Sequence, residues 1–155
     1  MEEVTIRPIK QDEWDNAMEL AFRVFLKFES KEYGKEGTEA FAQFVTDENL
    51  RKAFLAGQYP LFAAYMADEL IGIVALRSGN HLSLLFVDGR YHNQGIGTKL
   101  LNYAIDYMHK NTIFTKITVN AAPFAAGFYH GYGFHDTAPE TEKDGIIYIP
   151  MEKMI

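Results

Sequence analysis

Residues 82–101 constrain the fold more than any other stretch, because they join an apolar strand, a polar loop and an amphipathic helix. The strand ends near Val87, and the loop carries Gly95 and Gly97. The helix that follows has one apolar face, made of Leu100, Leu101, Ala104, Ile105 and Met108. In such a turn, backbone amides and a helix N-terminus point at one place, which favours a bound phosphate.

Composition limits the class of protein. A chain of 155 residues predicts one domain, spanning 1–155. Its net charge of −6 argues against nucleic acid; it suits a cationic small molecule or serves only solubility. No apolar run approaches the roughly 20 residues that cross a membrane, and we expect no membrane partner. The chain has no cysteine and its first residues are not an apolar signal, so we expect a cytoplasmic location.

The other periodicities predict an α+β fold, with a mixed, mostly antiparallel sheet of six to seven strands, a central βαβ unit and flanking helices. After a strand at 4–9, an amphipathic helix is expected behind a cap at Asp12, and residues 29–37 are expected as a loop. Two short helices follow, the second from Asp47 to Gly57. The other expected elements are strands at 60–66, 70–77, 81–87, 115–120 and 146–151, and a short helix at 124–130.

Two familiar phosphate motifs do not fit the loop. A P-loop requires an upstream glycine and a Gly-Lys-Ser/Thr order, whereas Thr98-Lys99 follows Gly97 here. A dinucleotide fingerprint requires a third glycine where this chain has Leu100, and it does not follow an antiparallel meander. The remaining alternatives are a glycine-rich turn without a ligand and a different phosphate motif.

The segment His92-Asn93-Gln94-Gly95-Ile96-Gly97 resembles the pyrophosphate motif of the GNAT superfamily of acetyl-CoA-dependent N-acetyltransferases, Arg/Gln-x-x-Gly-x-Gly/Ala, with His92 at the usual Arg or Gln position. The segment 119–134 is similar to the family's later motif, a strand, a short helix with Phe-Tyr, and Gly-Phe. The resemblance covers residues 60–155 and the strand at 4–9, and it implies a GNAT-like fold. Residues 29–58 fall in the family's variable acceptor region.

The resemblance implies that acetyl-CoA lies between two splayed strands. The residues then expected at the cofactor are Leu85, Phe86, Val87, His92, Asn93, Gln94, Gly95, Ile96, Gly97, Thr98, Asn120 and Tyr129. Asn120 has a second interpretation, as a cap at the end of its strand. Members of the family commonly form homodimers.

Acetyl transfer to an amine sets two proton problems. An alkyl ammonium with a pKa of about 10.4 costs about 4.6 kcal/mol to deprotonate at pH 7. The departing thiolate must also be stabilised, and Tyr129 matches the tyrosine that many members use for this. A phenol that donates a hydrogen bond helps without full proton transfer; a tyrosine that only packs is the alternative. Phe128 is expected in the core.

His81 lies where counting back from Val87 at the family's spacing places the general base, which is a Glu in many members. On an alternating strand it would share a face with Ser83, Leu85 and Val87, and an imidazole accepts a proton well near neutral pH. The alternative is a turn histidine bonded to the backbone. No His-x-Glu or paired-His spacing occurs, so no metal site is expected.

The acidic segment that carries Glu29 and Tyr33 falls on the acceptor side, and it predicts either recognition of a cationic amine or a solvated loop. The resemblance therefore implies an N-acetyltransferase that moves acetyl from acetyl-CoA directly to a primary amine, on a small molecule or a peptide. A non-catalytic acyl-CoA-binding module on the same fold is the alternative hypothesis, motivated by His92 and by the missing Glu.

Overall fold

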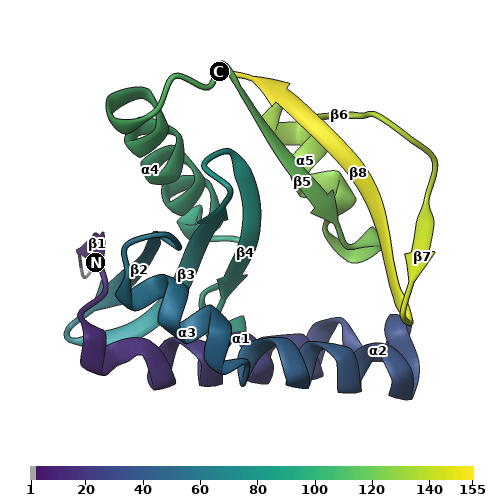
Figure 1. Ribbon diagram of the computed structural model, residues 1–155, viewed down its shortest axis with the longest axis horizontal. Coiled ribbons are helices and arrows are strands. Elements are labelled where there is room, and N and C mark those ends of the chain that lie inside the picture. The colour runs from purple at the N-terminus through teal and green to yellow at the C-terminus, as the bar shows by residue number, and fades with distance from the viewer. Residues whose placement is uncertain (1–2) are drawn as a thin grey trace.

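The computed structural model describes residues 3–155 and contains an eight-stranded sheet whose main path runs β1-β2-β3-β4-β5-β8-β6 (Figure 1). Two of the strands, β6 and β7, are short and raise the number beyond the six to seven expected. The strands are β1 (Val4–Pro8), β2 (Leu61–Met66), β3 (Glu69–Arg77), β4 (His81–Val87), β5 (Lys116–Ala121), β6 (His135–Asp136), β7 (Thr141–Lys143) and β8 (Ile146–Met154).

Helices cover both faces of the sheet, and each face has its own apolar core. The helices are α1 (Trp14–Phe28), α2 (Ser30–Val45), α3 (Glu48–Leu55), α4 (Ile96–Asn111) and α5 (Ala126–Tyr132). The core with α1 and α2 includes Phe25, Tyr59, Leu84 and Phe86. The other core, with α4 and α5, includes Leu100, Leu101, Ile117 and Tyr129.

The sheet opens between β4 and β5, which are its only parallel neighbours within residues 3–155. They pair only where His81 meets Thr118 and Leu82 meets Val119. Beyond these pairs the two strands diverge, so the carboxyl half of β4 has no sheet neighbour on one side (Figure 1). The predicted parallel βαβ unit, β4–α4–β5, is therefore present and is splayed.

Residues 29–37 were expected as a loop, and this prediction was wrong. Residues 30–37 belong to α2, which contains a kink at Gly34 (φ 66°, ψ −162°), and Glu29 forms the junction between α1 and α2. Tyr33 is buried and stacks on Phe25 at 5.3 Å, and Gly37 packs against the backbone of Gly145 in the β7–β8 turn. These tertiary contacts outweigh the low helix propensity of two glycines.

The expected cap at Asp12 is also replaced by another arrangement. Residues Gln11–Glu13 form a 3-10 turn, in which the Glu13 carboxylate accepts from the Lys10 amide at 2.7 Å. The same carboxylate accepts from Arg7 and from the Tyr65 hydroxyl, which lowers the Glu13 pKa to about 2. Asp47 caps α3 as predicted, because its side chain accepts from the Asn49 amide.

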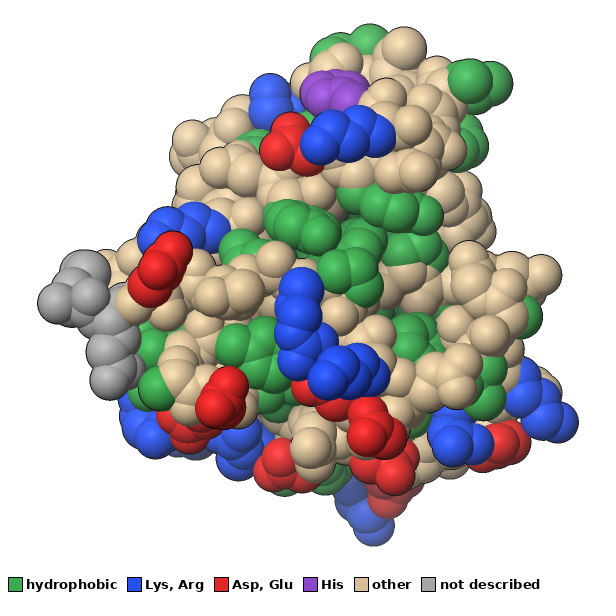
Figure 2. Space-filling view, turned by 90° about the vertical axis from the view of Figure 1, so that its left-hand side faces the viewer, with side chains coloured by type: hydrophobic (Ala, Val, Ile, Leu, Met, Phe, Trp, Pro, Cys, Tyr) green, Lys and Arg blue, Asp and Glu red, His purple; other side chains and the backbone are tan. Residues whose placement is uncertain are grey.

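Figure 2 shows the face of the molecule on the side of β1 and α4. Lys, Arg, Asp and Glu side chains are interspersed on it, with hydrophobic side chains between them. The net charge of −6 is therefore not expressed as a field of one sign on this face.

Candidate active site

The loop between β4 and α4 presents backbone amides to solvent. Asn93 (φ 62°) and Gly95 (φ 80°) both have left-handed backbone, and Gly95 caps α4 without a side-chain hydrogen bond. Residues 93–95 are exposed, whereas Ile96 is buried and anchors the first turn of α4. The first N–H groups of a helix have no partner inside it, so this end can receive an anion.

His92 lies at the start of this loop and points back toward the strand. Its Nε2 donates to the Val87 carbonyl at 2.7 Å, and its ring packs on Phe28 of α1 at 4.5 Å. The residue that departs from the family motif therefore closes the turn after β4. The Phe28 ring also lies close to the position a Cβ on Gly89 would take, at 2.8 Å.

Asp88 holds the loop from below and was missed by the sequence analysis. It is buried, and it accepts from Arg90 of the loop and from Arg23 of α1. These two guanidinium groups hold the pKa of Asp88 well below its ordinary value, and Arg90 has the larger effect. Arg90 also pairs with Glu69 at 2.6 Å. An acid directly after an apolar strand was the available signal.

A cleft of about 510 Å³ follows the splay between β4 and β5. It brings together seven of the predicted residues: Glu29, Tyr33, His81, Leu85, Phe86, Asn120 and Tyr129. Phe25, Phe41 and Phe44 also line it. Val87 does not line this cleft, and neither do residues 93–98, which form the end of the β4–α4 loop and the first turn of α4.

The backbone of β4 offers hydrogen-bonding groups to the splayed edge. The Asp88 amide donates to the Ile71 carbonyl of β3 at 2.8 Å. Backbone N–H and C=O groups point to alternate sides along a strand. Those of Val87 and Leu85 therefore point away from β3, toward the opening between β4 and β5. Of these, the Val87 carbonyl is already taken by His92.

A β-bulge corrects the predicted face of His81. The β3–β4 register shifts between Ala75 and Leu76, so Ser83 is an extra residue on β4. Ser83 bonds the Tyr59 hydroxyl at 2.8 Å, in the core under α1, whereas Leu85 and Val87 pack with the α4 core. Strict alternation of 81, 83, 85 and 87 on one face was therefore wrong.

His81 is bonded to a side chain, and the alternative of a backbone-bonded turn histidine does not describe it. Its Nδ1 lies 2.8 Å from the Thr118 hydroxyl of β5, across the last pair before the splay. Burial, and then Arg77, lower the pKa of His81 to about 4. The imidazole is thus neutral at pH 7 and is a weaker proton acceptor than a free histidine.

Tyr129 of α5 is buried, packs against Phe128 and Phe134, and lines the cleft. Its hydroxyl has no hydrogen-bond partner within residues 3–155. Burial, and then the charge of Glu29, raise its pKa. Phe128 was expected in the core, but it is 37% exposed, and its ring lies beside Gly97 in the first turn of α4.

Glu29 and Tyr33 face the same cleft from the α1–α2 junction. Burial, and then Glu32, raise the pKa of Glu29 to about 7. Burial, and then Glu29 and Glu32, raise the pKa of Tyr33. Glu29 is half-buried, so the solvated-loop alternative does not describe it.

Asn120 is the last residue but one of β5 and lies on the opposite wall of the cleft. Its side chain caps no helix: the 3-10 turn that follows begins behind Ala122 and has no side-chain cap. The strand-end cap is therefore not what this amide forms, and its polar atoms remain available in the cleft.

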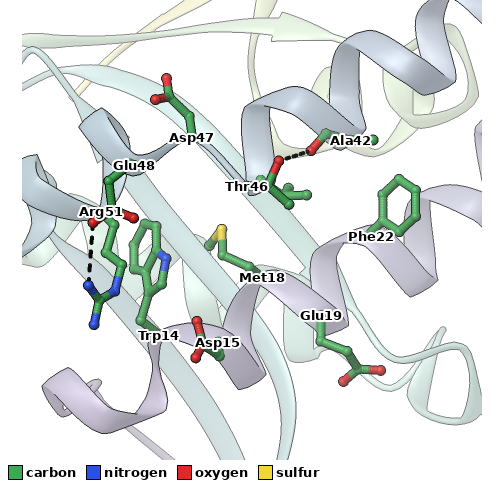
Figure 3. A pocket seen from close by; sticks show the side chains of 11 residues that line it. Trp14, Asp15, Met18, Glu19, Phe22, Ala42, Thr46, Asp47, Glu48 and Arg51 are labelled. Carbon is green, nitrogen blue, oxygen red and sulfur yellow. Dashed lines mark hydrogen bonds and ion pairs between the residues drawn. The ribbon is translucent and has the colours of Figure 1, made fainter.

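A second hollow, of about 420 Å³, lies between α1 and the α2–α3 corner (Figure 3). Trp14, Met18 and Phe22 line it together with Asp15, Glu19 and Asp47. Arg51, also on its wall, pairs with Glu48 at 3.5 Å. It contains none of the residues predicted for the site.

In the part of the chain that the structure describes, three or more potential metal-ligating side chains of the His, Cys, Asp or Glu type never gather in one place. Over the same residues, every helix is too short or too polar to cross a membrane.

Comparisons with known proteins agree with this architecture. A family model described as an acetyltransferase (GNAT) domain matches residues 29–155. An N-acetyltransferase of Rhodopseudomonas palustris superposes with a TM-score of 0.85 at 21% identity, covering 100% of this chain and 98% of that chain. The PaiA N-acetyltransferase of Thermoplasma acidophilum, solved with coenzyme A, gives 0.81 at 20% identity, covering 99% of each.

A spermidine N-acetyltransferase of Vibrio cholerae, solved with CoA and spermine, gives a TM-score of 0.71 at 19% identity, covering 97% of this chain and 95% of that chain. At these identities the structural likeness shows the fold. Fold and family match together define an acyltransferase of the type that uses acetyl-CoA. The chain belongs to the GNAT acetyltransferase family.

Proposed function

We propose that this protein transfers the acetyl group of acetyl-CoA directly to a primary amine in the cleft between β4 and β5. The observation that carries the proposal is that the cleft collects Tyr129, Asn120 and Glu29 beside the open edge of β4. Amide donors at residues 93–98 flank the end of that edge.

The residues fit the parts of an acyl-CoA. The exposed amides of the Gly95 turn suit the pyrophosphate, and Thr98 lies in the first turn of α4. Free backbone groups of Leu85 and the Asn120 amide suit the polar pantetheine arm. Since the Val87 carbonyl bonds His92, we expect Leu85 to make the main strand-like contact with the arm.

In this proposal Tyr129 stabilises the leaving sulfur. Its raised pKa makes full proton release costly, so its contribution is a hydrogen bond donated to the negative charge that develops on sulfur. The Tyr129 residue is buried as a whole, and a hydrogen bond is stronger in such surroundings than in bulk water.

The acceptor in this proposal is a primary amine. The acceptor side of the cleft combines the Glu29 carboxyl with the rings of Tyr33, Phe41 and Phe44. A carboxylate attracts an ammonium group, and aromatic faces add cation–π attraction.

The test is release of free thiol from acetyl-CoA with a panel of primary amines, comparing wild type with Tyr129→Phe. We expect wild-type turnover, and a loss in kcat of about 10²-fold in the variant while calorimetry gives nearly unchanged CoA binding. CoA binding without turnover of any amine would support an acyl-CoA-binding module instead. No binding at millimolar CoA would contradict both hypotheses.

A further inference from the structure

Several polar groups that face the cleft have no hydrogen-bond or ion-pair partner in the described part of the chain. Among them are the Glu29 carboxyl and the Tyr129 hydroxyl, and burial raises the pKa of both groups. An unpaired, partly desolvated acid is costly to the fold. A ligand that binds the Glu29 carboxyl would offset this cost.

The backbone that carries Glu29 is fixed from both sides. The preceding Phe28 packs on His92 at 4.5 Å and stacks on Phe124 at 5.9 Å between ring centroids, so it contacts the segments that follow β4 and β5. One turn later, Tyr33 is buried against Phe25. Glu29 therefore projects from the α1–α2 junction, between two residues that are held by packing contacts.

We propose that Glu29 is the catalytic base that accepts the proton of the acceptor ammonium, directly or through one water. This inference rests on the proposed function and deepens it. It gives Glu29 the role that the sequence alone indicated for His81.

The charges around Glu29 support this role. Lys143, Asp144, Arg77 and His81 also line the cleft, together with Tyr33, Tyr129 and Tyr148, and none of them pairs with Glu29 within residues 3–155. Glu32, on the next turn, adds negative charge. With a pKa of about 7, Glu29 is half ionised at neutral pH, which is near the optimum for a general base.

The protons balance as follows. The ammonium gives one proton to Glu29, and the free amine nitrogen attacks the thioester carbonyl. The C–N bond forms and the C–S bond breaks; the second amine proton leaves as the amide forms and ends on the CoA sulfur. Glu29 returns its proton to solvent. Because the charge of Glu29 raises the pKa of Tyr129, protonating Glu29 makes Tyr129 a better donor when sulfur leaves.

The experiment measures kcat/KM against pH for wild type and Glu29→Gln, with an alkylamine and with an arylamine that is already neutral at pH 7. We expect Glu29→Gln to lose about 10²-fold with the alkylamine and to lose the rise in rate centred near pH 7. The arylamine rate falls far less, because its nitrogen needs no prior deprotonation. Glu48→Gln, an exposed acid on α3 outside the cleft, is the matched control and keeps the wild-type profile.

An unchanged pH profile in Glu29→Gln, or equal losses with both amines, overturns the inference while leaving the proposed function standing. No turnover by wild type with any amine overturns both. A carbon-13 NMR titration of the wild-type Glu29 carboxyl gives a test that needs no folded variant. A midpoint near 7 supports the inference, and a midpoint below about 5, as for an ordinary glutamate, overturns it.

Discussion

At the scale of single residues, the surroundings of two titratable groups in the cleft shift their pKa values in opposite directions. Burial and Arg77 lower the pKa of His81 to about 4, while burial and Glu32 raise that of Glu29 to about 7. Burial disfavours the charged form of each group, so it lowers the pKa of a histidine and raises the pKa of a carboxyl group. The stronger base near neutral pH is therefore the carboxylate and not the imidazole.

Glu29 should make the free energy of unfolding depend on pH. Its folded pKa lies above its unfolded value of about 4.3, so its contribution to stability is complete below that value and is lost as pH rises through about 7. We expect Glu29→Gln to raise the free energy of unfolding by about 1–3 kcal/mol at pH 8 and to change it little at pH 4.

Denaturant unfolding of wild type and Glu29→Gln at pH 4, 6 and 8 measures this difference. Glu48→Gln is again the control, since Glu48 is exposed and outside the cleft. A variant that is less stable than wild type at pH 8 would show that Glu29 makes a stabilising contact, contrary to this account.

Local motifs predicted several residues of the candidate site, whose chemical roles stay predictions, but they did not predict all of its geometry. Gly95, Tyr129 and Asn120 were identified because their motifs are local, and the structure gathers Tyr129 and Asn120 in one cleft. The bulge at Ser83 could not be predicted, because it depends on how β3 pairs with β4. The bond from His92 to Val87 likewise depends on the path of the loop.

At the scale of elements, α2 shows why the acceptor region is hard to predict. Its glycines and charges indicate a loop, yet Tyr33 buries against α1 and Gly37 meets the β7–β8 turn. Local propensity loses here to contacts between segments distant in sequence. The meander β2–β4 and helix α4 were predictable, because their apolar periodicity is strong and local.

The kink in α2 should be destabilised by any side chain at position 34. At φ 66° and ψ −162°, Gly34 occupies a region almost restricted to glycine, and nothing lies within 4 Å of the position a Cβ would take. We therefore expect Gly34→Ala to destabilise the fold by about 1–3 kcal/mol through backbone strain alone.

Thermal unfolding of Gly34→Ala beside Gly131→Ala checks this expectation. Gly131 lies in α5 without a positive φ and is equally uncrowded, so alanine there should be neutral or stabilising by up to about 1 kcal/mol. Equal effects of the two substitutions would contradict the strained kink.

At the scale of the whole molecule, the fold consists of two sheet halves joined at one end. Within residues 3–155, the strands of the two halves pair only at His81–Thr118 and Leu82–Val119, and they diverge toward the carboxyl end of β4 (Figure 1). α1 and α2 run across the open end of the splay, and Phe28 contacts residues on both of its sides. The parallel order was predictable from the βαβ pattern; the divergence was expected only from the family resemblance.

The central claim is that CoA lies in this splay, with its pyrophosphate on the Gly95 turn and its arm along β4. Amide hydrogen exchange with and without CoA tests it most directly. We expect CoA to slow amide exchange at Leu85 and at residues 93–98, with little change at Trp14 or Arg51 in the second hollow, shown in Figure 3. Slower exchange confined to the second hollow, or unchanged exchange at β4 and the Gly95 turn when CoA is saturating, would contradict this binding mode.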